Sequence, residues 1–468
     1  MDIAAVIDYL NISFWQDWWR GYREKFHKFT ETGPTGQKIT RKLYSLKMAK
    51  KVSEDWASIL LNEKTTIGLK DKKSSEFIDS VLSDNKFVKK GNRLIEKTFA
   101  LGTGAFVLRL ENLNVKSNGA VLRNADTKIK IEYLSANHII PLSVQYGEIT
   151  EVAFVSDVLQ AGKKLIYLEI HRIEYGQYVI RNKYFKLEEG ALKEQPLPNG
   201  ILEELRTGGN VPMFSIVTPN TENNIDSSNA LGMSIFADAI DVLEGVDLAY
   251  NNFNRDFKLG GKKVFMNQSL VKRLSDGTTI TPDDVSQQLF VQTGDDLLDP
   301  MNGTKTLIQE HNPTLRVDEN VKGVQAQLDL LSFKCGLGSK YYRFDSSGNG
   351  KVMTATEYNG DRQDLVKNTN KHLLNVTDAL TSLIRAILWV GKELQGAQVN
   401  PDDKITIDFD DTYISDKASE RLQDIQDVRD GIMQKYEYRM KWYGEDEETA
   451  KSKVTDSSSG DVFGFGTE

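Results

Sequence analysis

Cysteine, proline and histidine are scarce in this chain, and their scarcity excludes several kinds of protein. There are one cysteine, ten prolines and five histidines in 468 residues. With Cys335 alone, the chain forms no internal disulfide framework and no metal site built from several cysteines, which fits a reducing compartment. Basic residues are also in deficit, since 59 Lys and Arg face 67 Asp and Glu, for a formal net charge of −8. The chain is therefore not a basic protein that coats DNA by neutralising phosphates.

Long apolar runs and targeting signals are also lacking. The first eight residues, MDIAAVID, have no basic flank and contain two acids, so we do not expect a secretory signal. The longest strongly apolar run, residues 383–390, is interrupted by Arg385 and is far shorter than the ~20 residues of a membrane span. We therefore expect no membrane association and a protein that is soluble in the cytosol when made.

Motifs for catalysis, nucleotides and metals are missing or incomplete. Each Gly-Lys pair lacks the glycine upstream and the Ser or Thr downstream that a phosphate-binding loop requires. Residues 345–350 imitate the start of a calcium loop, but its twelfth position is Thr356, and Glu357 comes one residue late. We therefore expect no enzyme activity, no cofactor and no metal. The histidines are interpreted as ordinary surface or core residues: His27, His138, His171, His311 and His372.

Two charged groups have plain structural interpretations. The acids near residue 410 are expected to be a solvated strand end or salt-bridge partners. A basic run in the second predicted helix could touch nucleic acid, but it is more typical of a solvated face that pairs with acids of a neighbouring subunit. The acids are Asp408, Asp410 and Asp411, and the basic run is Lys38, Arg41, Lys42, Lys47, Lys50 and Lys51.

Periodicity predicts an α+β fold. Helical patterns occupy residues 2–28, 40–62, 231–257, 319–333, 354–394, 416–434 and 436–443. Alternating, β-rich patterns occupy residues 105–110, 128–133, 151–155 and 405–409, with a hairpin of 164–172 and 177–185 that turns at Tyr175-Gly176. Residues 262–316 are predicted to form a small α/β excursion, residues 340–350 a polar loop, and residues after 444 a disordered tail.

Two of the predicted helices carry a single apolar stripe. In the helix over 231–257 the stripe would require a partner helix along a length on the order of 40 Å. Its residues are Ile235, Ala239, Val242, Val246, Ala249 and Phe253. The helix over 354–394 repeats the pattern with Leu373, Val376, Leu380, Leu383, Ile387 and Val390.

Four local sequences stand out, SNALGMSIFADAID (228–241), LGGKKVF (259–265), SSGNGKVMTATE (346–357) and residues 431–450. Together with the order of these elements, they resemble the portal proteins of tailed double-stranded DNA phages. The similarity is to the portal group of siphophages that infect Gram-positive bacteria, the SPP1-like group. SNALGMSIFADAID (228–241) resembles the opening of that family's first stem helix, and LGGKKVF (259–265) its exit into the clip. SSGNGKVMTATE (346–357) is similar to the segment that joins the tunnel loop to the long helix, and residues 431–450 resemble the crown.

The resemblance implies a division of the chain into portal parts. These are N-terminal helices and a β-rich/α wing (1–229), a first stem helix (230–258), a small α/β clip (259–317), a second stem helix (318–337), a tunnel loop (338–353), a long kinked helix with a return to the wing (354–411), a small helical crown (412–445) and a tail (446–468).

The resemblance also implies a function and partners. The chain would form a ring, usually of twelve copies, at one capsid vertex, through which double-stranded DNA is packaged and ejected. The terminase large subunit, head-completion or adaptor proteins, and major capsid and scaffolding proteins would be its partners. It would be in the virion, and in the host cytoplasm before assembly. Two alternatives stay open, a capsid or connector component that does not conduct DNA and a DNA-processing enzyme with a dispersed site.

Candidate channel residues follow from this resemblance. An acidic face on the first stem helix would repel the duplex and keep it sliding, with Asp238, Asp241, Glu244 and Asp247 on that face. DNA-facing cations near the tunnel loop would be Lys340, Arg343, Lys351 and, less directly, Lys334, although subunit salt bridges would explain them equally. Gly348 and Gly350 suit a loop that changes conformation, since glycine tolerates unusual φ values.

Overall fold

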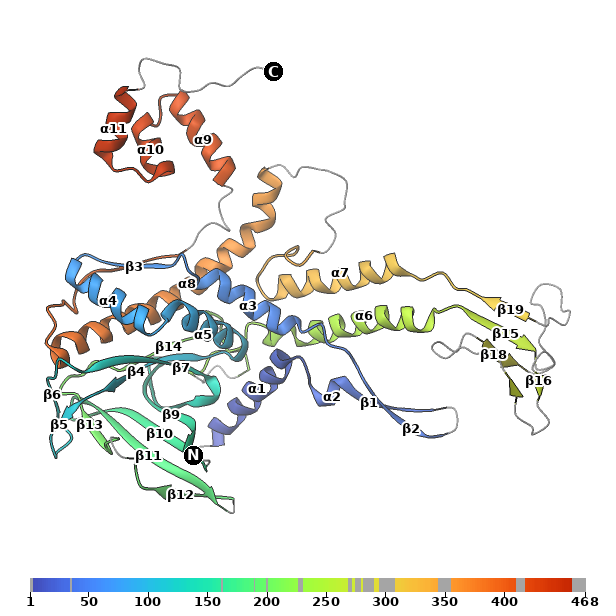
Figure 1. Cartoon of the computed structure of the whole chain (residues 1–468), viewed down its shortest axis with the longest axis horizontal. Helices are drawn as coiled ribbons and strands as arrows, with labels where there is room; N and C mark the ends of the chain where they lie inside the picture. The colour runs from blue at the N-terminus through green and yellow to red at the C-terminus, as the bar shows by residue number, and fades with distance from the viewer. Residues whose placement is uncertain are drawn as a thin grey trace.

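Two helices packed side by side project from a body of helices and sheets, as Figure 1 shows. This computed structural model describes residues 3–33, 36–160, 163–188, 190–198, 201–225, 230–267, 272–273, 279–280, 290–293, 308–343, 355–409 and 417–456. Helices and sheets both contribute to the body and largely alternate in blocks, so the α+β class expected from the sequence is confirmed.

The N-terminal region differs from the sequence prediction. The predicted helix over 2–28 ends at Arg20, because Gly21 adopts a left-handed φ of 78°. Residues Lys28–Thr32 and Lys38–Lys42 pair as antiparallel strands. The predicted helix over 40–62 begins only at Met48. The elements are α1 (Ile3–Arg20), α2 (Glu24–His27), β1 (Lys28–Thr32), β2 (Lys38–Lys42) and α3 (Met48–Leu60). Trp15 and Trp18 of α1 are buried, as expected of an amphipathic helix packed on the body.

A small sheet covered by helices holds much of the core. Its strand order is β14-β4-β7, and β4 and β7 confirm the predicted strands over 105–110 and 128–133. The helices over 72–101 were not predicted from the sequence. The bounds are β3 (Thr66–Leu69), α4 (Lys72–Asp84), α5 (Phe87–Leu101), β4 (Gly104–Glu111), β7 (Lys128–Ser135) and β14 (Phe214–Val217). The α5–β4 connection needs Gly102, whose φ is 88° and where a Cβ atom would lie 2.2 Å from the carbonyl oxygen of Gly232.

A larger antiparallel sheet follows in chain order. Its strand order is β12-β11-β10-β9-β8, and β13 pairs with β11. The predicted hairpin is confirmed, because Glu174 pairs with Gln177 around Tyr175 and Gly176, which both have positive φ as a two-residue turn requires. The bounds are β8 (Ile139–Gln145), β9 (Glu148–Gln160), β10 (Lys163–Glu174), β11 (Gln177–Glu188), β12 (Ala191–Gln195) and β13 (Glu204–Arg206), with the small pair β5 (Asn114–Val115) and β6 (Val121–Leu122) nearby.

The projecting helices are α6 (Ile240–Leu259) and α7 (Val317–Lys334). The prediction of a helix from residue 231 is wrong at its start, because the chain reaches α6 through a buried irregular segment and a 3₁₀ turn at Ala237–Ala239. At 20 residues α6 is roughly 30 Å long, shorter than expected. Beyond the helices, β15 (Lys263–Asn267) pairs with β18 (Phe290–Thr293) and β19 (Ile308–His311), and β16 (Lys272–Arg273) pairs with β17 (Thr279–Ile280).

The longest helix, α8 (Ala355–Val390), passes through the body and ends in a π-helical turn at Gly391–Gln395. Residues Gln363–Gln395 are long and apolar enough to cross a membrane by length and composition alone, although no uninterrupted apolar run marks them in the sequence. Half of that window is buried, and Leu380, Ile384 and Ile387 belong to the main core, so packing inside the protein explains its composition.

The C-terminal residues return to the body and then form a small helical group. The predicted strand over 405–409 is confirmed as β20 (Ile405–Asp408), which pairs with β3. The predicted disordered tail is wrong over residues 447–456, which form a helix that packs on its neighbour. The helices of this group are α9 (Lys417–Arg429), α10 (Lys435–Tyr443) and α11 (Glu447–Asp456).

Candidate functional site

The helices α6 and α7 are joined at their outer ends by a polar cluster. Asp256 of α6 accepts hydrogen bonds from the backbone and guanidinium of Arg316 and from the side chain of Asn320, at 3.1–3.2 Å. These contacts, led by those from Arg316, hold the pKa of Asp256 below its usual value. Further along, a Cβ atom at Gly245 would lie 2.6 Å from Oε1 of Gln327, so the two helices approach closely. The two helices therefore contact each other both near Asp256 and near Gly245.

The acids predicted for a channel face lie in different environments. Asp241 is exposed, and Asp238, also exposed, accepts hydrogen bonds from Asn224 at 2.9 and 3.1 Å. Glu244 is only partly exposed, and partial burial together with the nearby charge of Asp241 raises its pKa. Of the four predicted acids, the two exposed ones therefore lie just before and at the start of α6.

The prediction that Asp247 belongs to the acidic channel face is wrong, because Asp247 is buried. It is 3% exposed, and its carboxylate lies 3.0 Å from Nε2 of His27 and accepts a 2.7 Å hydrogen bond from the backbone N–H of Leu46. His27 is itself fully buried, and its Nδ1 contacts the backbone of Arg23. Asp247 therefore fastens the N-terminal region to α6 instead of lining a channel.

The segment after α7 is anchored to α3 before the chain reaches the predicted tunnel loop. Tyr342 is buried, and its hydroxyl donates a 2.8 Å hydrogen bond to Asp55. Burial, and then the charge of Asp55, raise the pKa of Tyr342. The indole of Trp56 donates to the carbonyl of Cys335 at 3.0 Å. Burial raises the pKa of the Cys335 thiol to about 12, so this thiol is unreactive at neutral pH.

The structure describes three of the four candidate cations. Lys334, Lys340 and Arg343 are all exposed, at or next to the anchored segment. Lys351, Gly348 and Gly350 lie outside the described residues. So do all of residues 345–350, the start of the calcium-like loop, and most of the predicted excursion over 262–316.

The long helix is held by a buried histidine. His372 of α8 accepts a hydrogen bond from the backbone N–H of Asn220 at 3.0 Å and packs edge-on against Trp56 and Phe99. Burial lowers its pKa to about 4, with a smaller contribution from Lys371. His372 is therefore a neutral core residue at pH 7, as interpreted from the sequence.

The basic run is not a helical face. Lys38, Arg41 and Lys42 are on strand β2, and Lys47 precedes α3 with a left-handed φ of 56°. Several members pair within the chain. Arg41 contacts Glu31, Lys50 contacts Glu96 at 3.0 Å, and Lys51 contacts Asp55.

Titratable residues elsewhere form structural networks. His171 Nε2 lies 3.2 Å from Glu169, which also contacts Arg109 at 3.1 Å. Although burial opposes it, His171 and Arg109 lower the pKa of Glu169. No group of three His, Cys, Asp or Glu residues able to hold a metal occurs in the described part of the chain.

In this arrangement, a projecting pair of helices is fixed to a body of mixed helices and sheets. A sequence model of the family "Phage portal protein, SPP1 Gp6-like" matches residues 11–453 of the 468. The chain belongs to this family of phage portal proteins. No curated protein matches the chain.

Membership establishes the function at the level of the family. The protein is a portal, a virion component that forms a capsid-associated ring and serves packaging of the phage genome. It is a structural channel protein and not an enzyme. The alternative of a component that does not conduct DNA is not favoured.

The sequence did not predict the buried contacts that hold α6 and the segment after α7 against the body. The Tyr342–Asp55 and Asp247–His27 pairs join residues 287 and 220 positions apart, and no local pattern marks them. The basic helix α5 had a local signal, since apolar residues recur at helical spacing over 87–101, and this periodicity could have predicted it.

Proposed function

We propose that the parts of this chain correspond to those of a portal subunit. The helices and sheets before residue 230 would be the N-terminal helices and wing, α6 and α7 the stem, the strands around β15 the clip, and α9 and α10 the crown. The tunnel loop would be residues 338–353. One observation carries this assignment. The stem helices pack on each other yet leave large apolar side chains exposed, as a subunit that packs against identical neighbours requires. These are Leu248, Phe257, Leu330 and Phe333.

Guidance of DNA would then be passive. Asp238 and Asp241 repel the duplex at the start of α6, while Lys334, Lys340, Arg343 and Lys351 make brief contacts with its phosphates. The anchored Tyr342 gives the tunnel loop a fixed base, so that Gly348 and Gly350 would be the points at which the loop changes shape.

Partners would dock on separate parts. The clip, 259–317, would contact the terminase large subunit during packaging and a head-completion or adaptor protein afterwards. Major capsid and scaffolding proteins would contact the outside of the ring. Subunits would be made in the host cytoplasm and assembled into a dodecamer before they enter the capsid.

The assembly is tested by native mass spectrometry and end-on class averages of the purified protein. We expect annular particles of twelve copies. Leu248→Glu, which places a charge on the exposed side of α6, should abolish rings but leave the monomer folded. Leu192→Glu is the matched control, since Leu192 is similarly exposed on the edge strand β12. Rings that form equally well with Leu248→Glu would remove α6 from the interface.

The loop is tested by deleting residues 346–350. Rings should assemble normally, and DNA filling of capsids should be impaired. Normal filling in the deletion variant would remove the loop from the mechanism.

A further inference from the structure

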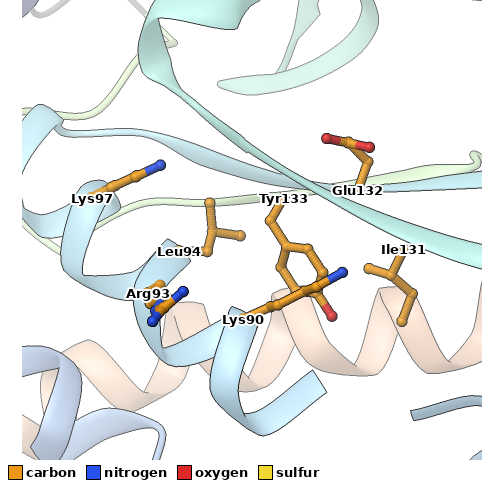
Figure 2. A pocket seen from close by; sticks show the side chains of 7 residues that line it. All are labelled: Lys90, Arg93, Leu94, Lys97, Ile131, Glu132 and Tyr133. Atoms are coloured by element: carbon orange, nitrogen blue, oxygen red, sulfur yellow. The ribbon is translucent and has the colours of Figure 1, made fainter. Parts of the chain in front are cut away.

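A pocket of about 220 Å³ opens between α5 and β7 in the body, and its lining residues belong to these two elements (Figures 1 and 2). Figure 2 shows Lys90, Arg93 and Lys97 in succession along α5, with Tyr133 of β7 directed toward the helix. Glu132 lies at the margin of the pocket, where Arg109 is 3.4 Å away and offsets its charge. The pocket thus has an excess of positive charge.

The cations form a row that lacks acidic partners. Lys86, Lys90, Arg93 and Lys97 are spaced by four, three and four residues, which places them along one face of the helix. All four are exposed, and none makes an ion pair within the described part of the chain. Glu96, the acid of α5, points elsewhere and pairs with Lys50 at 3.0 Å. In a protein of net charge −8, such a row indicates an anionic ligand.

Tyr133 adds a second, independent observation. Its hydroxyl is buried and has no hydrogen-bond partner among the described residues. Burial and then the charge of Glu132 raise the pKa of Tyr133, so the phenol keeps its proton at neutral pH and serves as a donor. A buried donor without an acceptor is costly, and an anion in the pocket would satisfy it.

We propose that this pocket and the row along α5 bind backbone phosphates of duplex DNA, at a site separate from α6, α7 and the tunnel loop. The pocket has room for a phosphate group and some of its water, since a water molecule takes about 30 Å³. The row from Lys86 to Lys97 spans roughly 16 Å, the axial length of several phosphates on one strand. A single carboxylate would need one cation, whereas a polyanion matches a row, and a portal that serves DNA packaging meets DNA as its polyanion.

The test is binding of a short labelled duplex to assembled rings across a salt series. The triple variant Lys90→Gln, Arg93→Gln and Lys97→Gln should reduce the slope of log affinity against log salt by about 0.9 for each phosphate that is no longer neutralised. The triple variant Lys25→Gln, Lys116→Gln and Lys404→Gln changes net charge equally at exposed positions outside α5 and β7, and it should bind like the wild type. Tyr133→Phe should weaken binding about 2- to 10-fold with the salt slope unchanged.

Three results would overturn the proposal. One is equal salt slopes for the two triple variants. Another is full affinity for the duplex in Tyr133→Phe. Because this variant removes only one oxygen atom, it tests the proposal even if the first triple variant fails to form rings. The third is preferential loss of oligoglutamate binding over duplex binding in the first triple variant, which would assign the pocket to an acidic protein. Because α5 is apart from the proposed channel, impaired capsid filling in the loop deletion neither supports nor contradicts this site.

Discussion

At the scale of single residues, buried polar pairs decide which acids are structural. Asp247→Ala should lower the free energy of unfolding by about 2–4 kcal/mol, because it leaves His27 and the N–H of Leu46 buried without their acceptor. Asp241→Ala on the same helix is the matched control and should change stability by less than about 0.5 kcal/mol, since Asp241 is exposed. Chemical denaturation measures both, and equal effects would contradict the structural role of Asp247.

His372 should make stability depend on pH. Its folded pKa of about 4 lies below the unfolded value of about 6.5, so the unfolded state binds more protons between these values. The contribution of this residue is therefore fully present above pH 6.5 and declines as the pH falls toward 4, by on the order of 3 kcal/mol.

The measurement is the unfolding midpoint of wild type and His372→Asn between pH 7 and 4.5. Asparagine keeps a side-chain acceptor for the N–H of Asn220 but does not titrate there. We expect the variant to lose less stability over this range than the wild type. Parallel pH profiles would show that His372 is not the titrating group.

At the scale of elements, the segment before the predicted loop is held by the hydrogen bond from Tyr342 to Asp55, which can be removed while the aromatic ring stays. Tyr342→Phe deletes the hydroxyl that donates to Asp55, so residues 335–343 should exchange amide hydrogens faster while α6 is unaffected. Tyr44→Phe, at a residue that is 65% exposed, is the control and should leave exchange unchanged. Unaltered exchange at 335–343 in Tyr342→Phe would show that Trp56 and the apolar contacts hold the segment alone.

The elements also show what the sequence could predict. The β10–β11 hairpin and α8 were predicted because turn residues and helical periodicity are local signals. The start of α6 was wrong, since Met233 and Phe236 continue an apolar pattern but are buried in an irregular segment before the helix. The hairpin over 28–42 was overlooked because its strands are short and exposed, with no apolar alternation to mark them. Among site residues, Asp241 is exposed and its place on a channel face stays a prediction, whereas Asp247 is buried against the distant His27, which no local pattern indicates.

At the scale of the whole molecule, a ring repeats each charge once per subunit, so a small local change becomes a large change in the channel. The double variant Asp238→Lys and Asp241→Lys replaces two negative charges by two positive ones in every copy. If these residues line the channel, attraction to phosphates replaces repulsion, and the duplex should be retained instead of sliding. DNA filling of capsids should then slow severalfold at low salt and recover as salt rises, because screening weakens these contacts.

The control makes the same change of charge outside the proposed channel. Asp79 of α4 and Asp402, which precedes β20, are both exposed, and Asp79→Lys with Asp402→Lys should leave filling at the wild-type rate if the ring has the proposed orientation. Ring assembly, checked by native mass spectrometry, should be equal for both double variants, since neither removes an apolar contact. Equal slowing by both double variants would mean that net charge, and not position, controls filling. The acids at the start of α6 would then not be the residues that line the channel.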